Sequence, residues 1–300
     1  LALIDAGGFV AMKRAALDEL LSRDLGSDPD AREERFKEAI LAARVHPEMG
    51  QRPSVECVLH NLLPRRFVVH THQTLVNMIC CSENGEALAA EMFGDEILWI
   101  PYVDPGFTLA KKLSRALKEY VERTGRDCPV ALLMQNHGLI VCADTPEQIR
   151  QHTDWLISKI RARLSRLPDG SALGRVRQVE SSKTRDLINR LGPVLRILLA
   201  TGDLPKVVTF DDSATVMSLA GAEEGQAIVL GGPLTPDQIV YCNSFPLWFE
   251  PLENEPSAAL IERMKRAIEN HVAATRFPPL VILVEGLGMF TAGDDFAQAD

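Results

Sequence analysis

The stretch RPSVECVLHNLLPRRFVVHTH, residues 52–72, carries the pattern that decides the fold of the first part of the chain. A helical spacing of apolar residues follows Ser54 and ends at Pro64, and the apolar run FVV then leads into His70 and His72. A serine ahead of such spacing is typical of a helix N-cap, and a β-branched run is typical of a buried strand. The stretch therefore predicts a helix of two to three turns followed by a strand.

The two histidines at the end of this predicted strand are one residue apart. Side chains at positions i and i+2 of a strand point to the same face, so His70 and His72 project together. Two imidazoles at that spacing can share one metal ion, and they can equally form a hydrogen-bonded pair in the core. The H-x-H pattern alone leaves both interpretations open.

Further residues favour the metal site. In Asn136-His137-Gly138, at a break between two apolar runs, the glycine permits a sharp turn that lets a third imidazole face inward. Glu56 lies on the helix just before the strand, with His60 one helical turn later. Three neutral histidines with one open position are typical of catalytic zinc, and a nearby carboxylate can act as a base. The predicted ligands are His70, His72 and His137.

The order of periodic segments predicts an α/β protein with two domains. Strands and helices alternate through residues 1–168, and LPDGSALG (167–174) has the composition of a linker. Residues 175–300 form a smaller α/β unit, with a long predicted helix in PSAALIERMKRAIENHVAA. Its predicted strands are KVVTF, QAIVLGG, DQIVYCN and PLVILVEG. We detect no internal repeat in the sequence.

Composition excludes several classes of function. The formal charge of −9, without a cluster of unmatched Lys and Arg, argues against nucleic-acid binding. No apolar run reaches the roughly 20 residues of a membrane helix and no signal-peptide pattern opens the chain, so we expect a cytoplasmic protein without membrane contact. The six cysteines include no C-x-x-C pair, and we expect reduced thiols with packing roles.

A glycine loop near the C-terminal end suggests a dinucleotide site. LVEGLGMFTAG (283–293) follows a buried strand and precedes a predicted helix, but its glycines are spaced as Gly286-x-Gly288-x-x-x-x-Gly293 rather than G-x-G-x-x-G. A tight strand-to-helix turn explains the loop without a cofactor. A fragment of an NAD-dependent dehydrogenase remains an alternative.

Three segments together resemble the class II aldolase/adducin family. Residues 52–72 are followed at the family's spacing by IPYVDPGFTLA (100–110) and NHGLIV (136–141), and the resemblance covers about residues 1–165. GGPLTPDQIVYCNSFPLWFEP together with VEGLGMFTAG resembles the segment after the aldolase domain in bifunctional rhamnulose-1-phosphate aldolase/short-chain alcohol dehydrogenases. The resemblance implies a three-layer α/β/α domain with a mainly antiparallel sheet.

The resemblance also implies roles for individual residues. His70, His72 and His137 match the histidines that bind Zn2+ or another divalent metal, and Glu56 matches the acid/base. Ser54 and Asn136 match substrate-binding positions, whereas Val55 stands where the family has a serine that meets the phosphate.

The expected activity is that of a zinc-dependent aldolase, a lyase of carbohydrate metabolism. It cleaves or forms a ketose 1-phosphate, giving dihydroxyacetone phosphate and an aldehyde such as lactaldehyde. The alternatives are a sugar-phosphate 4-epimerase or a dehydratase of the same fold, or a non-catalytic adducin-like module. The resemblance further implies a homo-oligomer, with rings of four subunits as the family's usual assembly.

Overall fold

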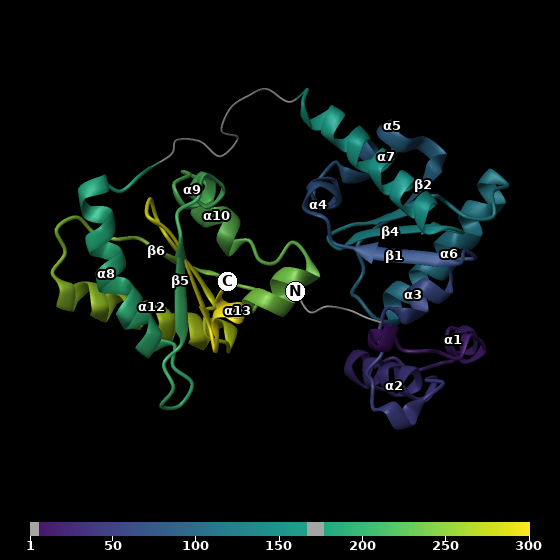
Figure 1. Ribbon diagram of the computed structural model, residues 1–300, viewed down its shortest axis with the longest axis horizontal. Helices are drawn as coiled ribbons and strands as arrows, with labels where there is room; N and C mark the ends of the chain where they lie inside the picture. The colour runs from purple at the N-terminus through teal and green to yellow at the C-terminus, as the bar shows by residue number, and fades with distance from the viewer. Residues whose placement is uncertain (1–5, 167–176) are drawn as a thin grey trace. The chain divides into compact units, whose positions relative to one another are not determined.

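The computed structural model describes residues 6–166 and 177–300 and divides into two compact units, Leu1–Leu167 and Pro168–Asp300 (Figure 1). Each unit contains a four-stranded sheet covered by helices. The predicted linker 167–174 lies outside the described residues, and the predicted boundaries at 168 and 175 fall there as well and stay predictions. Among the described residues, no helix combines the length and apolarity needed to cross a bilayer.

The sheet of the first unit has the strand order β1-β4-β3-β2. Its pairs are antiparallel except β2 with β3, which confirms a mainly antiparallel sheet. The strands are β1 (Phe67–Thr71), β2 (Ile97–Ile100), β3 (Ala131–Met134) and β4 (Gly138–Ala143). The helices are α1 (Arg14–Leu20), α2 (Pro29–Ala42), α3 (Cys57–Asn61), α4 (Thr74–Cys80), α5 (Gly85–Phe93), α6 (Phe107–Thr124) and α7 (Pro146–Leu164), and the short 3₁₀ turns are Ala6–Gly8, Pro47–Met49 and Gly94–Glu96.

Two apolar layers cover the two faces of this sheet. Successive strand residues point to opposite faces, so Leu132 and Ile140 pack with α1, α2, α3 and α6. Leu133 and Leu139 pack on the other face with α4, α5 and α7. The predicted three-layer α/β/α architecture is therefore confirmed.

The helix predicted between Ser54 and Pro64 is shorter than expected. Helix α3 begins only at Cys57, because a turn precedes it in which the Cys57 N–H donates to the Ser54 carbonyl at 3.2 Å. The Ser54 hydroxyl accepts from the Glu56 N–H at 3.1 Å, so the serine stabilises this turn. Glu56 consequently occupies the N-cap position of α3.

The second unit contains four strands in the order β5-β8-β7-β6. Its strands are β5 (Val207–Asp211), β6 (Leu247–Phe249), β7 (Val281–Val284) and β8 (Gly288–Gly293). Its helices are α8 (Ser181–Leu198), α9 (Ala214–Ala220), α10 (Gly225–Leu230), α11 (Pro236–Cys242), α12 (Ser257–Thr275) and α13 (Phe296–Ala299).

Three strand predictions are wrong. QAIVLGG and DQIVYCN lie largely in helices α10 and α11, because a short apolar run does not distinguish a strand from a buried helix. For α11 the signal was present, since Thr235 and Pro236 form a typical helix start. The third, FVAMK (9–13), also has the residue pattern of a strand, but it contributes only an isolated bridge between Met12 and Arg44.

The second sheet repeats the first in strand order, direction and register. Strand β1 runs from the pair Phe67 with Ala143 to Thr71 with Leu139, and β5 runs from Val207 with Gly293 to Asp211 with Met289. The parallel pair β2–β3 has its counterpart in β6–β7. The expectation of no internal repeat was wrong, because the two units repeat the same strand order and pairing register.

Candidate metal centre

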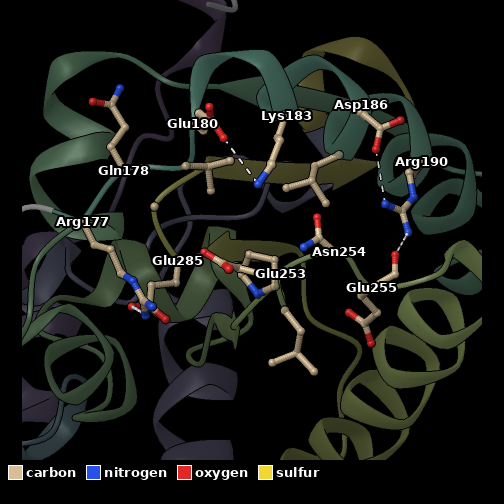
Figure 2. A pocket seen from close by; sticks show the side chains of 15 residues that line it. Arg177, Gln178, Glu180, Lys183, Asp186, Arg190, Glu253, Asn254, Glu255 and Glu285 are labelled. Atoms are coloured by element: carbon tan, nitrogen blue, oxygen red, sulfur yellow. Dashed lines mark hydrogen bonds and ion pairs between the residues drawn. The ribbon is translucent and has the colours of Figure 1, made fainter.

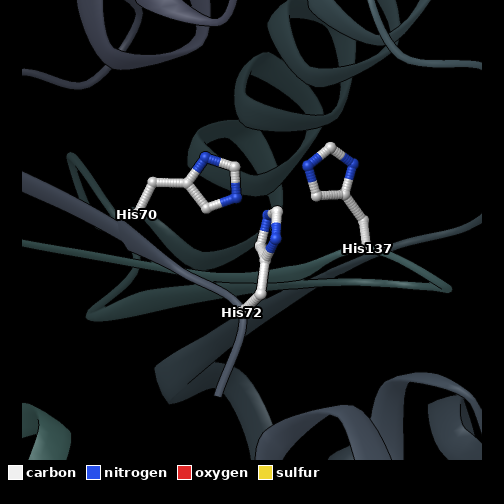
Figure 3. A group of neighbouring side chains, drawn as sticks. All are labelled: His70, His72 and His137. Carbon is white, nitrogen blue, oxygen red and sulfur yellow. The ribbon is translucent and has the colours of Figure 1, made fainter. Parts of the chain in front are cut away.

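Three histidines meet at one end of the first sheet. His70 is on β1, His72 follows that strand directly, and His137 lies in the turn between β3 and β4. Because the end of β1 pairs with the start of β4, residues about 65 positions apart in sequence become neighbours. Each histidine offers a ligand atom, and these three atoms all lie within 4.8 Å of one another (Figure 3).

The three imidazoles form a compact and largely buried cluster. The ring centroid of His70 lies 4.9 Å from that of His72 and 5.1 Å from that of His137, and the last two rings are 5.1 Å apart. The side chains of His70 and His137 are only 6% and 5% exposed. His70 Nε2 is buried with no hydrogen-bond partner. A lone buried nitrogen is unfavourable, and a bond to a cation would satisfy it, so these residues fit a divalent metal.

The turn that carries His137 depends on Asn136 and Gly138 in different ways. The left-handed residue is Asn136, with φ 54°, and its N–H donates to the Cys80 carbonyl at 3.0 Å. Gly138 was expected to permit the sharp turn, but its role is spatial. A Cβ at Gly138 would lie 2.6 Å from His72 Cδ2 and 2.7 Å from the Thr71 carbonyl oxygen.

Glu56 lies against two of the three histidines. Its carboxylate oxygens are 3.1 Å from His70 Nδ1 and 2.9 Å from His137 Nε2. Burial by itself raises the pKa of Glu56, but hydrogen bonds from His137 and His70 outweigh that effect and hold the pKa well below its ordinary value. The carboxylate is therefore ionised at neutral pH and oriented by the same imidazoles that form the cluster.

A family comparison agrees with this geometry. Residues 31–163 match the model of the class II aldolase and adducin N-terminal domain family. The first unit is a class II aldolase/adducin domain. The resemblance in residues 52–72, 100–110 and 136–141 is thereby confirmed at the level of the family.

Two individual proteins are also similar to the chain. A Bacillus subtilis (strain 168) protein named uncharacterized oxidoreductase YuxG is 26% identical over 318 residues, which cover 100% of this chain. The chain spans only 44% of that relative's length. The solved N-terminal class II aldolase domain of a conserved protein from Thermoplasma acidophilum is 24% identical, with a TM-score of 0.45, and the match covers 54% of this chain and 68% of that one.

His60 lies close to the histidine cluster of this class II aldolase domain but outside the group of three. Its ring centroid is 6.0 Å from that of His70. Burial, and then the neighbouring His70, lower the pKa of His60 below the ordinary histidine value. A neutral imidazole at this place adds little positive charge beside a cation site.

The two predicted substrate residues of the domain have structural contacts of their own. Ser54 is exposed and its hydroxyl holds the Glu56 N–H, while Asn136 shapes the turn before His137. Their contact with a substrate stays a prediction. The sequence interpretation missed Gln135, whose Oε1 accepts from the Tyr102 N–H at 3.1 Å and so connects this turn with the loop after β2. A lone glutamine before NHG carries no signal for that role.

Proposed function

We propose that the first unit is a metal-dependent aldolase that cleaves or forms a ketose 1-phosphate. The observation that carries the proposal is the convergence of His70, His72 and His137 beside the ionised Glu56. Three imidazoles with room for a further ligand are the typical donor set of catalytic zinc, although other divalent metals accept the same donors. The class II aldolase/adducin match supports this chemistry.

A cation held by the three histidines would polarise a ketone carbonyl and stabilise the negative charge that develops on its oxygen. The chain itself supplies the proton transfer. Glu56, whose carboxylate lies 3.1 Å from His70 Nδ1 and 2.9 Å from His137 Nε2, is the group that would act as the base. A base beside a carbonyl bound at this site can remove a proton next to that carbonyl. The resulting carbanion forms the new C–C bond with the aldehyde, the aldehyde oxygen takes up a proton, and cleavage follows the same steps in reverse.

The identity of the substrate is the finer part of the proposal. We infer a sugar phosphate such as a rhamnulose-1-phosphate-like ketose, which yields dihydroxyacetone phosphate and an aldehyde. Val55 supplies no hydroxyl where the family has a phosphate-binding serine, so the phosphate would rely on Ser54, Asn136 and other groups. A homotetramer in the cytoplasm belongs to the same proposal, and light scattering of the purified chain tests the assembly.

Related reactions use the same residues. A sugar-phosphate 4-epimerase or a dehydratase needs the same cation and base, and analysis of products separates them because an epimerase releases no triose. A non-catalytic adducin-like module has no need of the three-histidine cluster. Absence of stoichiometric metal in the purified protein would support that module.

The glycine loop gives no support to a dinucleotide site. Gly286 lies in the turn between strands β7 and β8, and Gly288 is the first residue of β8. A dinucleotide fingerprint needs a strand, the glycine loop and then a helix whose N-terminus meets the pyrophosphate. The strand-to-helix turn expected here is therefore wrong. The word oxidoreductase in the name of the Bacillus relative describes a protein of which this chain spans less than half.

The decisive experiment is proton exchange of dihydroxyacetone phosphate in heavy water, followed by NMR with the zinc-loaded protein. The proposal predicts loss of one proton signal at the carbon that bears the free hydroxyl, and a chelator should stop that loss. Zinc bound in stoichiometric amount without any exchange would contradict the aldolase.

A further inference from the structure

The second unit matches the first in details that go beyond strand order. Added Cβ atoms on Gly85 and on Gly225 would meet the same two neighbours, a helix carbonyl oxygen and the ring of a tryptophan in the second strand of the sheet. These tryptophans, Trp99 and Trp248, sit at matching register positions. The turn after the third strand of each sheet is held by the same kind of hydrogen bond. The Gly286 N–H donates to the Ala220 carbonyl at 2.8 Å, and the Asn136 N–H donates to the Cys80 carbonyl at 3.0 Å.

The register shows what replaces the metal ligands in this second copy. Phe210 pairs in β5 at the position that His70 has in β1, and Asp212 follows that strand as His72 follows β1. Leu287 takes the place of His137 in the turn between the last two strands. Among residues 177–300 there is no counterpart of the three-histidine group. No imidazole is left at this end of the second sheet to hold a cation.

The space at this end of the second sheet is partly filled by the chain itself. The Val179 N–H donates to the Gly286 carbonyl at 2.7 Å, so the segment before α8 crosses the turn. A Cβ on Gly286 would lie 3.2 Å from Val179 N and 3.3 Å from the Arg177 carbonyl oxygen. Phe210, at the register position of His70, packs on Phe290 with ring centroids 4.9 Å apart, so an apolar ring occupies the place of an imidazole.

A pocket of about 340 Å³ opens beside this turn (Figure 2). Its wall comes from residues 177–180, from the first half of α8, from residues 251–255 after β6, and from Glu285 and Gly286. The corresponding elements of the first unit are the loop after β2 and the turn that carries His137. The pocket therefore lies at the end of the second sheet that corresponds to the metal centre of the first.

The polar groups of the pocket are mixed in sign, and several of them are paired with one another. Arg177 contacts Glu285 at 2.9 Å, and Lys183 lies 3.3 Å from Glu180. Arg190 donates to the Glu255 carbonyl at 2.7 Å, while its buried Nε has no hydrogen-bond partner. Five acidic residues and three basic ones line the wall. Their excess of negative charge opposes a phosphate or a dinucleotide, because either would bring further negative charge against the carboxylates.

We propose that the second unit is a metal-free copy of the first whose pocket binds a neutral polyhydroxylated molecule by hydrogen bonds alone. The carboxylates of the wall accept hydrogen bonds from hydroxyl groups, and its guanidinium, ammonium and amide groups donate hydrogen bonds to hydroxyl oxygens. A neutral polyol can therefore bond to both the acceptors and the donors of the wall. Apolar side chains such as Leu187 and Leu252 supply contacts for the carbon skeleton. The volume suits a molecule the size of a monosaccharide, near the lower end of the usual range of ligand pockets.

Isothermal titration calorimetry of the whole chain with ribitol and with D-galactose tests the pocket, with inorganic phosphate as the charged probe. At least one polyol should bind equally well before and after treatment with a chelator. Glu285→Gln should weaken that binding at least tenfold, and so should Asn254→Gly, which removes a pocket amide at a residue with φ 54° where glycine is tolerated. Glu262→Gln, an exposed exchange of the same kind outside the pocket, is the matched control.

Several results would overturn the proposal. They are no binding of either polyol, binding that needs metal, tighter binding of phosphate, or full affinity in both pocket variants. Metal analysis is independent of these titrations and should give one equivalent per chain, with none in His137→Ala; two equivalents would overturn the metal-free copy. None of these results depends on the aldolase reaction of the first unit, so the two proposals can fail separately.

Discussion

Gly138 and His72 are packed so closely that no side chain fits between them: a Cβ on Gly138 would lie 2.6 Å from His72 Cδ2. The same Cβ would lie 2.7 Å from the carbonyl oxygen of Thr71, which is backbone and cannot swing away. The ring of His72 is therefore held in position by the first residue of β4.

Gly138→Ala is expected to displace His72 and to weaken metal binding. Overpacking of this kind also lowers the free energy of unfolding by about 1–3 kcal/mol. Metal titration and thermal unfolding measure the two effects. Gly192→Ala in α8 is the control, because nothing beyond its chain neighbours lies within 4 Å of its Cβ. Pro193 follows it and offsets the usual gain of alanine in a helix, so we expect little change in stability and unchanged metal affinity. Unchanged metal affinity in Gly138→Ala would contradict the role given to this contact.

Removal of one imidazole should abolish tight metal binding. His72→Ala leaves two ligands, and we expect the affinity for Zn2+ to fall by more than about 100-fold, since loss of a residue that only hydrogen-bonds a ligand already costs about 10–100-fold. His60→Gln is the matched control, because His60 lies beside His70 but outside the group of three. Competition with a chromophoric chelator measures both variants. Equal losses in the two would mean that the ligand set is wrong.

Glu56→Gln separates metal binding from proton transfer. The amide cannot act as a base, so proton exchange of the substrate should fall by at least about 100-fold, while stoichiometric zinc is retained. NMR exchange and metal analysis are made on the same sample. Glu48→Gln, an exposed carboxylate that contacts His46, serves as the control and should exchange normally. Full activity of Glu56→Gln would exclude this residue as the acid/base.

The two copies should respond alike to the same mutation. Gly85→Ala and Gly225→Ala each push a methyl group against a helix carbonyl and a tryptophan ring, Trp99 or Trp248. We expect each to lower the free energy of unfolding of its own unit by about 1–3 kcal/mol. Hydrogen exchange followed by mass spectrometry assigns the loss to one unit or the other. A glycine that tolerates alanine in only one unit would show that the copies differ at this contact.

Cys128 and Cys142 form a pair of buried thiols with Sγ atoms 3.3 Å apart. Their hydrogen bond lowers the pKa of Cys128 and raises that of Cys142, so Cys128 is the thiol that deprotonates first. A thiolate beside a second thiol forms a disulfide when an oxidant is supplied, and the sulfurs need to move only from 3.3 Å to the bond length of about 2.05 Å. Diamide should therefore join these two cysteines before any other pair. Peptide mapping of native protein checks this, and Cys142→Ala should leave Cys128 free.

The local sequence determined the elements whose pattern depends on neighbouring residues. Strand alternation put His70 and His72 on one face, and helix α7 begins at a Thr-Pro pair, Thr145 and Pro146, which is typical of a helix start. Strands β3 and β4, on either side of the turn at Asn136 and His137, were indicated by two apolar runs with a break between them. In each case the determining interactions lie within about one helical turn or one strand, so they can be read from consecutive residues.

Only the tertiary structure decided the contacts that join distant residues. The pairing of β1 with β4 brings His137 close to His70, because hydrogen bonds between the strands set their register. The turn before α3 places the Glu56 carboxylate against both histidines. The short apolar runs 226–232 and 237–243 became helices because their packing partners, absent from any local window, decide between strand and helix. The repeat also became visible only in the structure. Backbone pairing keeps the same register in both sheets, while Phe210 and Leu287 stand at the positions of His70 and His137.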